Sequence, residues 1–189
     1  MNDLMPADAA AFDDAWHTRW PDARPVGYEL RDAAAGSWVR FHSLPESKRY
    51  AETDAERAEV LRRHLVVLRE LCDAASADPA DLRVVTATFS ESAEQQSYWQ
   101  SVRLDLDDPE SWWAHLRVRR TGLESAELRA LLRRVADDEA QGVIIAPPDA
   151  AWLYHPYDGG ADVIAPDAHL RDELKRDHAD WLSSHPLGL

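Results

Sequence analysis

A histidine and an aspartate near the end of the chain are the residues best placed to do chemistry. The stretch LYHPYDGGADVI, residues 153–164, holds His155 and Asp162 on either side of an Asp-Gly pair. Asp-Gly is a strong signal for a two-residue β-hairpin loop of type I′, in which both loop residues have positive φ. A turn centred on Asp158 and Gly159 sets His155 opposite Asp162 on one face of the hairpin. A carboxylate beside an imidazole orients the ring and favours its protonated form, so this pair could serve in acid/base chemistry.

Two alternatives to this catalytic interpretation stay open. Pairs of opposite charge also face each other across strands as simple sheet contacts, which is the plainer explanation. A three-residue loop with Gly160 as a bulge would instead place His155 opposite Val163 and remove the pair. Because Pro156 has no backbone N–H, we expect its strand to lie at an edge of the sheet or to carry a bulge.

The loop SLPESKRY, residues 43–50, is the second candidate site. Its Lys48 and Arg49 could hold a carboxylate or a phosphate, and His42 lies just before it. These residues and the hairpin would together form the pocket of a small-molecule enzyme. In so acidic a chain the two cations could instead pair with carboxylates elsewhere. The candidate catalytic residues are His155, Asp162 and His42, and the candidate binding residues are Lys48, Arg49, Tyr50, Tyr157, Asp158 and Gly159.

Other residues that could ligate a metal or act as a nucleophile have simpler explanations. His64 and Cys72 fall on the apolar stripe of a predicted helix, which indicates a hydrogen-bonded core histidine and a buried thiol. A single cysteine forms no intramolecular disulfide. The sequence contains neither HxxxH nor HExxH spacing. We therefore predict no metal site and no cofactor.

Hydrophobic spacing and capping residues predict the elements that position these groups. Helical periodicity covers residues 6–20, 53–75, 123–139 and 166–186. Strand patterns cover residues 38–44, 82–89, 101–106, 115–121 and 142–147, besides the hairpin, and Tyr28 and Leu30 suggest a further extended segment. The predicted fold class is α+β, with a mainly antiparallel sheet packed on one side by about four helices and closed by the C-terminal one.

We expect a single globular domain over residues 1–189, in which the helical segment 1–25 could be peripheral. Acidic residues outnumber basic ones by 35 to 21, which gives a net charge of −14. Such a charge repels nucleic acid and would steer a cationic protein partner toward the surface. The N-terminus lacks a signal-peptide pattern, and no apolar run approaches the ~18–20 residues that cross a bilayer. We therefore expect a cytoplasmic protein that binds neither nucleic acid nor membrane.

Four blocks of the chain resemble a known family. They are FHSLPESKRY (41–50), RRHLVVLREL (62–71), YHPYDGGADVI (154–164) and RDELKRDHADWLSSHPLGL (171–189). They are similar to characteristic blocks of an uncharacterised bacterial, largely actinobacterial, family catalogued as a domain of unknown function. The resemblance spans most of the chain from about Trp38 onward and implies no activity. The closing HPLGL carries apolar residues that we expect to dock on the body or on a partner.

Two functions from different classes fit these observations. The first is a non-catalytic, acidic protein-binding domain, one form of which is a toxin-neutralising, immunity-type protein. Its support is the charge, the lack of a catalytic motif and the eight tryptophans, which are natural anchors in interfaces. The alternative is a small-molecule enzyme that uses His155 and Asp162 as an acid/base pair beside an anion-holding SLPESKRY loop.

Overall fold

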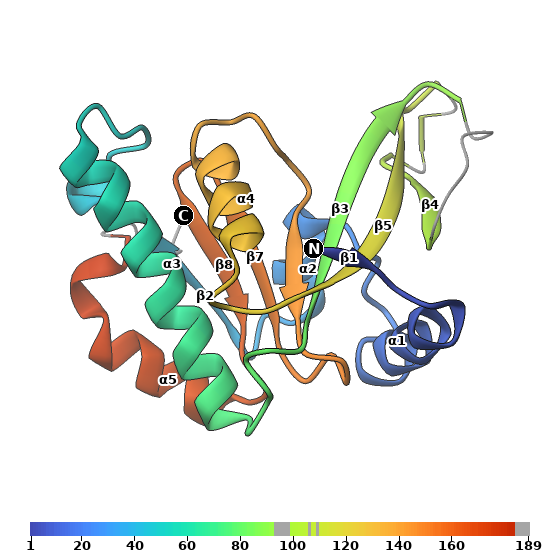
Figure 1. Ribbon diagram of the computed structural model, residues 1–189, viewed down its shortest axis with the longest axis horizontal. Helices are drawn as coiled ribbons and strands as arrows, with labels where there is room; N and C mark the ends of the chain where they lie inside the picture. The colour runs from blue at the N-terminus through green and yellow to red at the C-terminus, as the bar shows by residue number, and fades with distance from the viewer. Residues whose placement is uncertain (93–98, 106, 109, 184–189) are drawn as a thin grey trace.

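A computed structural model describes residues 1–92, 99–105, 107–108 and 110–183 of the chain. It is an α+β domain built on an antiparallel sheet of eight strands (Figure 1). The strands are β1 (Asn2–Asp3), β2 (Trp38–His42), β3 (Leu82–Ser90), β4 (Gln100–Arg103), β5 (Trp113–Thr121), β6 (Ile144–Ala146), β7 (Leu153–Tyr157) and β8 (Gly160–Ile164). Their order is β1-β5-β3-β6-β7-β8-β2, and β4 pairs with β5 beside β1. The predicted fold class is therefore confirmed.

Helices cover both faces of this sheet. The α-helices are α1 (Pro6–Arg19), α2 (Leu30–Ala33), α3 (Asp54–Ala74), α4 (Ala126–Ala136) and α5 (Ala168–Asp177), and the short 3₁₀ turns are η1 (Gly27–Glu29), η2 (Pro45–Ser47) and η3 (Ala179–Trp181). Helices α3, α4 and α5 share one apolar core with alternate strand residues, whereas α1 and α2 pack into a second core with the other residues of the strands. The expectation of helices on one side only is wrong, because Phe12 and Trp16 of α1 are buried on the opposite face.

The segment around Tyr28 is helical rather than extended. Tyr28 lies in η1, and Leu30 begins α2. Leu30 is almost fully buried in the core beneath α1, so packing overrides the strand preference of an isolated tyrosine. The result is a tight, folded connection that crosses this face of the sheet before β2 begins.

The hairpin of β7 and β8 has the predicted register. His155 pairs with Asp162, and Tyr157 pairs with Gly160 across the turn. The predicted turn type is wrong, because neither Asp158 nor Gly159 has positive φ. Contacts outside the hairpin hold this loop: the Gly159 carbonyl accepts the backbone N–H of Ser43 at 3.0 Å.

β7 does not lie at an edge of the sheet, contrary to the expectation raised by Pro156. It lies between β6 and β8, while β2 forms the edge beyond β8. β6 is so short that it pairs with β7 only at Ile145 and Tyr154. Pro156 is therefore tolerated inside the sheet because the ladder on its outer side has already ended.

Helix α3 carries the predicted core histidine. A capping box between Thr53 and Glu56 starts the helix. Further along the helix, His64 is buried, with Nδ1 2.6 Å from the hydroxyl of Tyr154 and Nε2 3.4 Å from that of Ser43. The interpretation of His64 as a hydrogen-bonded core residue is confirmed.

No helix within the described residues is long and apolar enough to traverse a bilayer. The closing HPLGL segment, residues 185–189, lies outside the described residues.

The burial of His64 predicts a loss of stability in mild acid. Burial lowers the pKa of His64 from 6.5 to about 4, so below pH 6.5 the unfolded chain binds more protons than the folded one. The contribution of neutral His64 to the free energy of unfolding is fully present above pH 6.5. It is lost as the pH falls toward 4, a change on the order of 3 kcal/mol. Urea unfolding at pH 7.5, 5.5 and 4.5 measures it.

His64→Gln is the matched variant, since it keeps polar atoms at this position but cannot titrate. We expect it to be less stable than the wild type at pH 7.5 and to lose less stability on acidification. The wild type and the variant share every carboxylate, so the comparison cancels their titration. Equal slopes for the two proteins would contradict the assignment.

Candidate ligand-binding pocket

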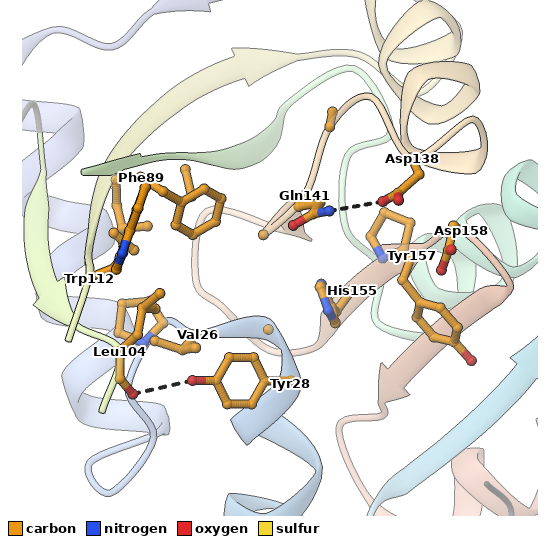
Figure 2. A pocket seen from close by; sticks show the side chains of 18 of the residues that line it. Val26, Tyr28, Phe89, Leu104, Trp112, Asp138, Gln141, His155, Tyr157 and Asp158 are labelled. Carbon is orange, nitrogen blue, oxygen red and sulfur yellow. Dashed lines mark hydrogen bonds between the residues drawn. The ribbon is translucent and has the colours of Figure 1, made fainter. Parts of the chain in front are cut away.

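A pocket of about 510 Å³ opens beyond the end of β6, where β3 and β7 diverge. β3 pairs with β6 only from Arg83 to Val85, and then continues with β5 toward the upper right of Figure 1. The end of β7 turns back into the hairpin instead. The pocket occupies this divergence, and its walls are the η1 segment, the far ends of β3 and β5, the loop after α4, and the hairpin (Figure 2). Its size is within the range that small-molecule sites occupy.

One end of the pocket is aromatic. Tyr28, Phe89 and Trp112 line it with 54, 39 and 49% of their surfaces exposed. Five large apolar side chains are exposed in the described part of the chain, and these are three of them. Trp112 alone of the eight tryptophans is exposed. Exposed apolar side chains that gather in this way make this end of the pocket a candidate binding surface.

Small residues leave the aromatic end open. Phe89 lies opposite Ala114, and Ala87 lies opposite Leu116 in the β3–β5 ladder. Gly142 closes the wall from the other side with φ of 66°, where an added Cβ would lie 3.0 Å from that of Ala87. A side chain at position 142 would be both strained and crowded.

The other end of the pocket is polar. Figure 2 shows Asp138, Gln141, His155, Tyr157 and Asp158 gathered there. The Gln141 amide donates to Asp138 at 2.9 Å. These residues come from the loop after α4 and from the hairpin.

A Schellman motif at the end of α4 places Asp138. The backbone N–H of Glu139 donates to the carbonyl of Arg134, and that of Asp138 donates to Val135. Asp138 itself has φ of 58°, a left-handed conformation that aspartate tolerates better than most residues. The helix end therefore directs a carboxylate-bearing turn toward the pocket.

His155 links the two ends as a neutral hydrogen-bond acceptor. Its Nδ1 lies 2.7 Å from the carbonyl of Val143. Burial lowers the pKa of His155, so the ring is neutral at pH 7 and carries a single N–H. Because a carbonyl can only accept, that hydrogen is on Nδ1, and Nε2 carries the lone pair. Gly27 covers the ring, since a Cβ there would lie 2.2 Å from Cε1.

Asp162 does not orient His155, although the two residues face each other across the hairpin. Its carboxylate accepts two hydrogen bonds from Arg40, at 2.8 and 2.9 Å, and one from Trp38 at 3.0 Å. Asp162 is buried, and its two carboxylate oxygens are bound by the guanidinium of Arg40, which is the stronger charge partner. The orienting group of His155 is the Val143 carbonyl instead.

Besides the backbone contact of Ser43 with Gly159, the SLPESKRY loop reaches the hairpin through the side chains of Arg49 and Tyr50. Both side chains donate to Asp158, Tyr50 at 2.9 Å. Arg49, Tyr157 and Asp158 also line the pocket. Lys48 points elsewhere, to Glu56 at 2.7 Å and Glu52 at 3.2 Å. The alternative in which these cations pair with carboxylates of the chain is confirmed.

His42 is not among the residues that line the pocket. It lies on β2, opposite Gly160 of β8. Burial lowers its pKa, and its Nε2 is buried without a hydrogen-bond partner in the described structure. The structure thus brings His155 together with Arg49, Tyr157 and Asp158, and leaves His42 and Lys48 outside that group.

Sequence reasoning missed the aromatic end and the α4 loop. Nothing near Phe89, Trp112 or Asp138 forms a recognisable motif, and only the excess of tryptophan pointed to a recognition surface. Gly27 gave a weak signal, since a glycine between valine and tyrosine suggests a close approach of the backbone.

Fold and site together define an α+β domain with a pocket that is aromatic at one end and rich in acceptors at the other. Within the described part of the chain, no three His, Cys, Asp or Glu side chains gather to hold a metal ion. The chain belongs to the family described as Domain of unknown function (DUF3885), whose model matches residues 26–186. This match confirms the family resemblance. No curated protein and no solved structure matches the chain.

The contact between Gly27 and His155 can be tested with a matched pair of variants. Gly27→Ala places a methyl group inside the imidazole ring's contact distance, so we expect a loss of about 1–3 kcal/mol in the free energy of unfolding. Gly36→Ala, where nothing lies within 4 Å of the new methyl group, should change stability by less than about 0.5 kcal/mol. Urea denaturation compares them, and equal effects would refute the close packing.

Proposed function

We propose that this domain is a non-catalytic module that binds a cationic partner protein and uses the pocket as its anchoring site. One observation carries the proposal: the exposed Trp112 lies with Tyr28 and Phe89 around a single pocket. Tryptophan and tyrosine dominate the binding energy of protein interfaces when they fill or line a concave site. A toxin-neutralising, immunity-type role is one form that such binding could take.

The charge of the chain and of the pocket supports a cationic partner. The net charge of −14 draws a basic protein toward the surface from a distance and raises the association rate at low salt. Among the described residues that line the pocket, the only arginine or lysine is Arg49, which already pairs with Asp158. Asp138 adds a second carboxylate. An anion that entered the pocket would therefore find, among these described residues, no arginine or lysine that is not already paired with a carboxylate.

The alternative of a small-molecule enzyme has one observation in its favour, the neutral His155 inside a pocket of suitable size. The other members of the expected catalytic group do not join it. Asp162 is bound by Arg40, and Lys48 is bound by two glutamates. A histidine without an acidic or nucleophilic partner is weak support for catalysis.

Partner capture from extracts of the native host tests the proposal. The baits are the wild type, Trp112→Ala and the control Met5→Ala, which removes an exposed apolar side chain away from the pocket. We expect a basic protein that the wild type and Met5→Ala retain, and that Trp112→Ala binds at least about 30-fold more weakly, as for a hot-spot residue. Calorimetry with the identified partner measures the affinity and its weakening by salt.

Two outcomes would contradict this function. A partner that binds all three baits equally would place the interface elsewhere, and an acidic partner would overturn the charge argument. Thermal melts of the three baits show whether each is folded, and an exposed position such as Trp112 should tolerate alanine.

A further inference from the structure

The polar end of the pocket presents several hydrogen-bond acceptors. The lone pair of His155 Nε2 is one acceptor, because Nδ1–H is used by the Val143 carbonyl. The carboxylate of Asp138 and the side-chain carbonyl of Gln141 are others. Oδ2 of Asp158 is occupied by Arg49 and Tyr50, which leaves Oδ1.

The protein itself already uses several of the donors at this end. The Gln141 amide donates to Asp138, and Tyr50 donates to Asp158. Arg49 donates to Asp158 from Nε, and its guanidinium lies 5.4 Å from the centre of the Tyr50 ring at the exposed rim. A group that enters the polar end therefore meets acceptors that need donors.

We infer that the pocket takes an arginine side chain of the partner together with an apolar side chain beside it, the guanidinium at the polar end and the apolar group among Tyr28, Phe89 and Trp112. This inference rests on the proposed function and names the chemistry of its anchor.

Arginine fits the arrangement better than lysine does. Its planar guanidinium carries five N–H donors in fixed directions, which suits acceptors that come from separate elements, and it stacks on aromatic faces. The pocket volume of about 510 Å³ belongs to the range that drug-sized ligands fill, so a single arginine would leave the aromatic end empty. An apolar neighbour in the partner's chain accounts for that end.

Capped dipeptides test the inference directly. Their binding to the wild-type protein is measured by calorimetry and by the change in tryptophan fluorescence, to which the exposed Trp112 contributes. The probe is acetyl-Phe-Arg-amide, and the matched probe is acetyl-Phe-citrulline-amide, which keeps the shape and loses the charge. We expect the citrulline peptide to bind at least about tenfold more weakly, as the loss of a charge-assisted hydrogen bond implies. Acetyl-Phe-Glu-amide should not bind, and agmatine, which lacks the apolar group, should bind more weakly than the arginine peptide.

Two neighbouring aspartates supply a matched pair of variants. Asp138→Asn removes the charge at the pocket and keeps a residue that tolerates the left-handed conformation, so the loop should retain its shape. Asp137→Asn removes the same charge one residue away, outside the pocket. We expect Asp138→Asn to weaken the arginine peptide about five- to tenfold, while Asp137→Asn leaves its affinity unchanged.

Several results would overturn the inference. They are the absence of binding by the arginine peptide, equal binding of the citrulline or glutamate peptide, and equal effects of the two aspartate variants. Agmatine that binds as tightly as the arginine peptide would assign the pocket to a small free cation. None of these results decides the proposed function, because partner capture by Trp112→Ala and Met5→Ala is measured independently of any arginine.

Discussion

The shortness of β6 is the constraint on which the pocket depends. Three residues pair β6 with β3, and only Ile145 faces β7, so the sheet is continuous at one end and divided at the other. Gly142, with its positive φ, turns the chain out of the ladder just before the strand begins. A longer β6 would have satisfied the edges of β3 and β7 and filled the space between them. The pocket is therefore a consequence of where the ladder stops, and no loop had to be inserted to make it.

The register of the β7–β8 hairpin then decides which side chains face that space. Tyr154 points into the core of α3 and bonds to His64, while His155 points to the opposite face and lines the pocket. A slip of one residue would exchange these roles, bringing a polar ring into the core and an apolar surface to solvent. The bidentate contact of Arg40 with Asp162 holds the neighbouring β2–β8 pair in its observed alignment.

Local signals in the sequence were sufficient for much of the architecture. The α+β class, the capping box at Thr53, the core role of His64 and the hairpin register all follow from patterns within a few residues. The turn type, the interior position of β7 and the partner of Asp162 do not, because contacts with distant segments determine them. The candidate site divides in the same way: His155 and Asp158 lie in a recognisable block, whereas Phe89 and Trp112 belong to strand ends that meet them only in space. No local pattern in a single sequence indicates that these strand ends lie close to the hairpin.

The chemistry of His155 favours recognition over proton transfer. A general base must accept a proton readily, but burial and the guanidinium of Arg40 lower the pKa of His155, and the opposing effects of Val143 and Asp162 are smaller than burial. A carbonyl on Nδ1 fixes the tautomer yet cannot take a proton from the ring, so no relay continues beyond it. The same features suit a hydrogen-bond acceptor: its tautomer is fixed, its ring is held by Gly27, and it stays neutral at pH 7. An acceptor of this kind beside carboxylates distinguishes ligands by the donors they bring, which is the property a specific anchor requires.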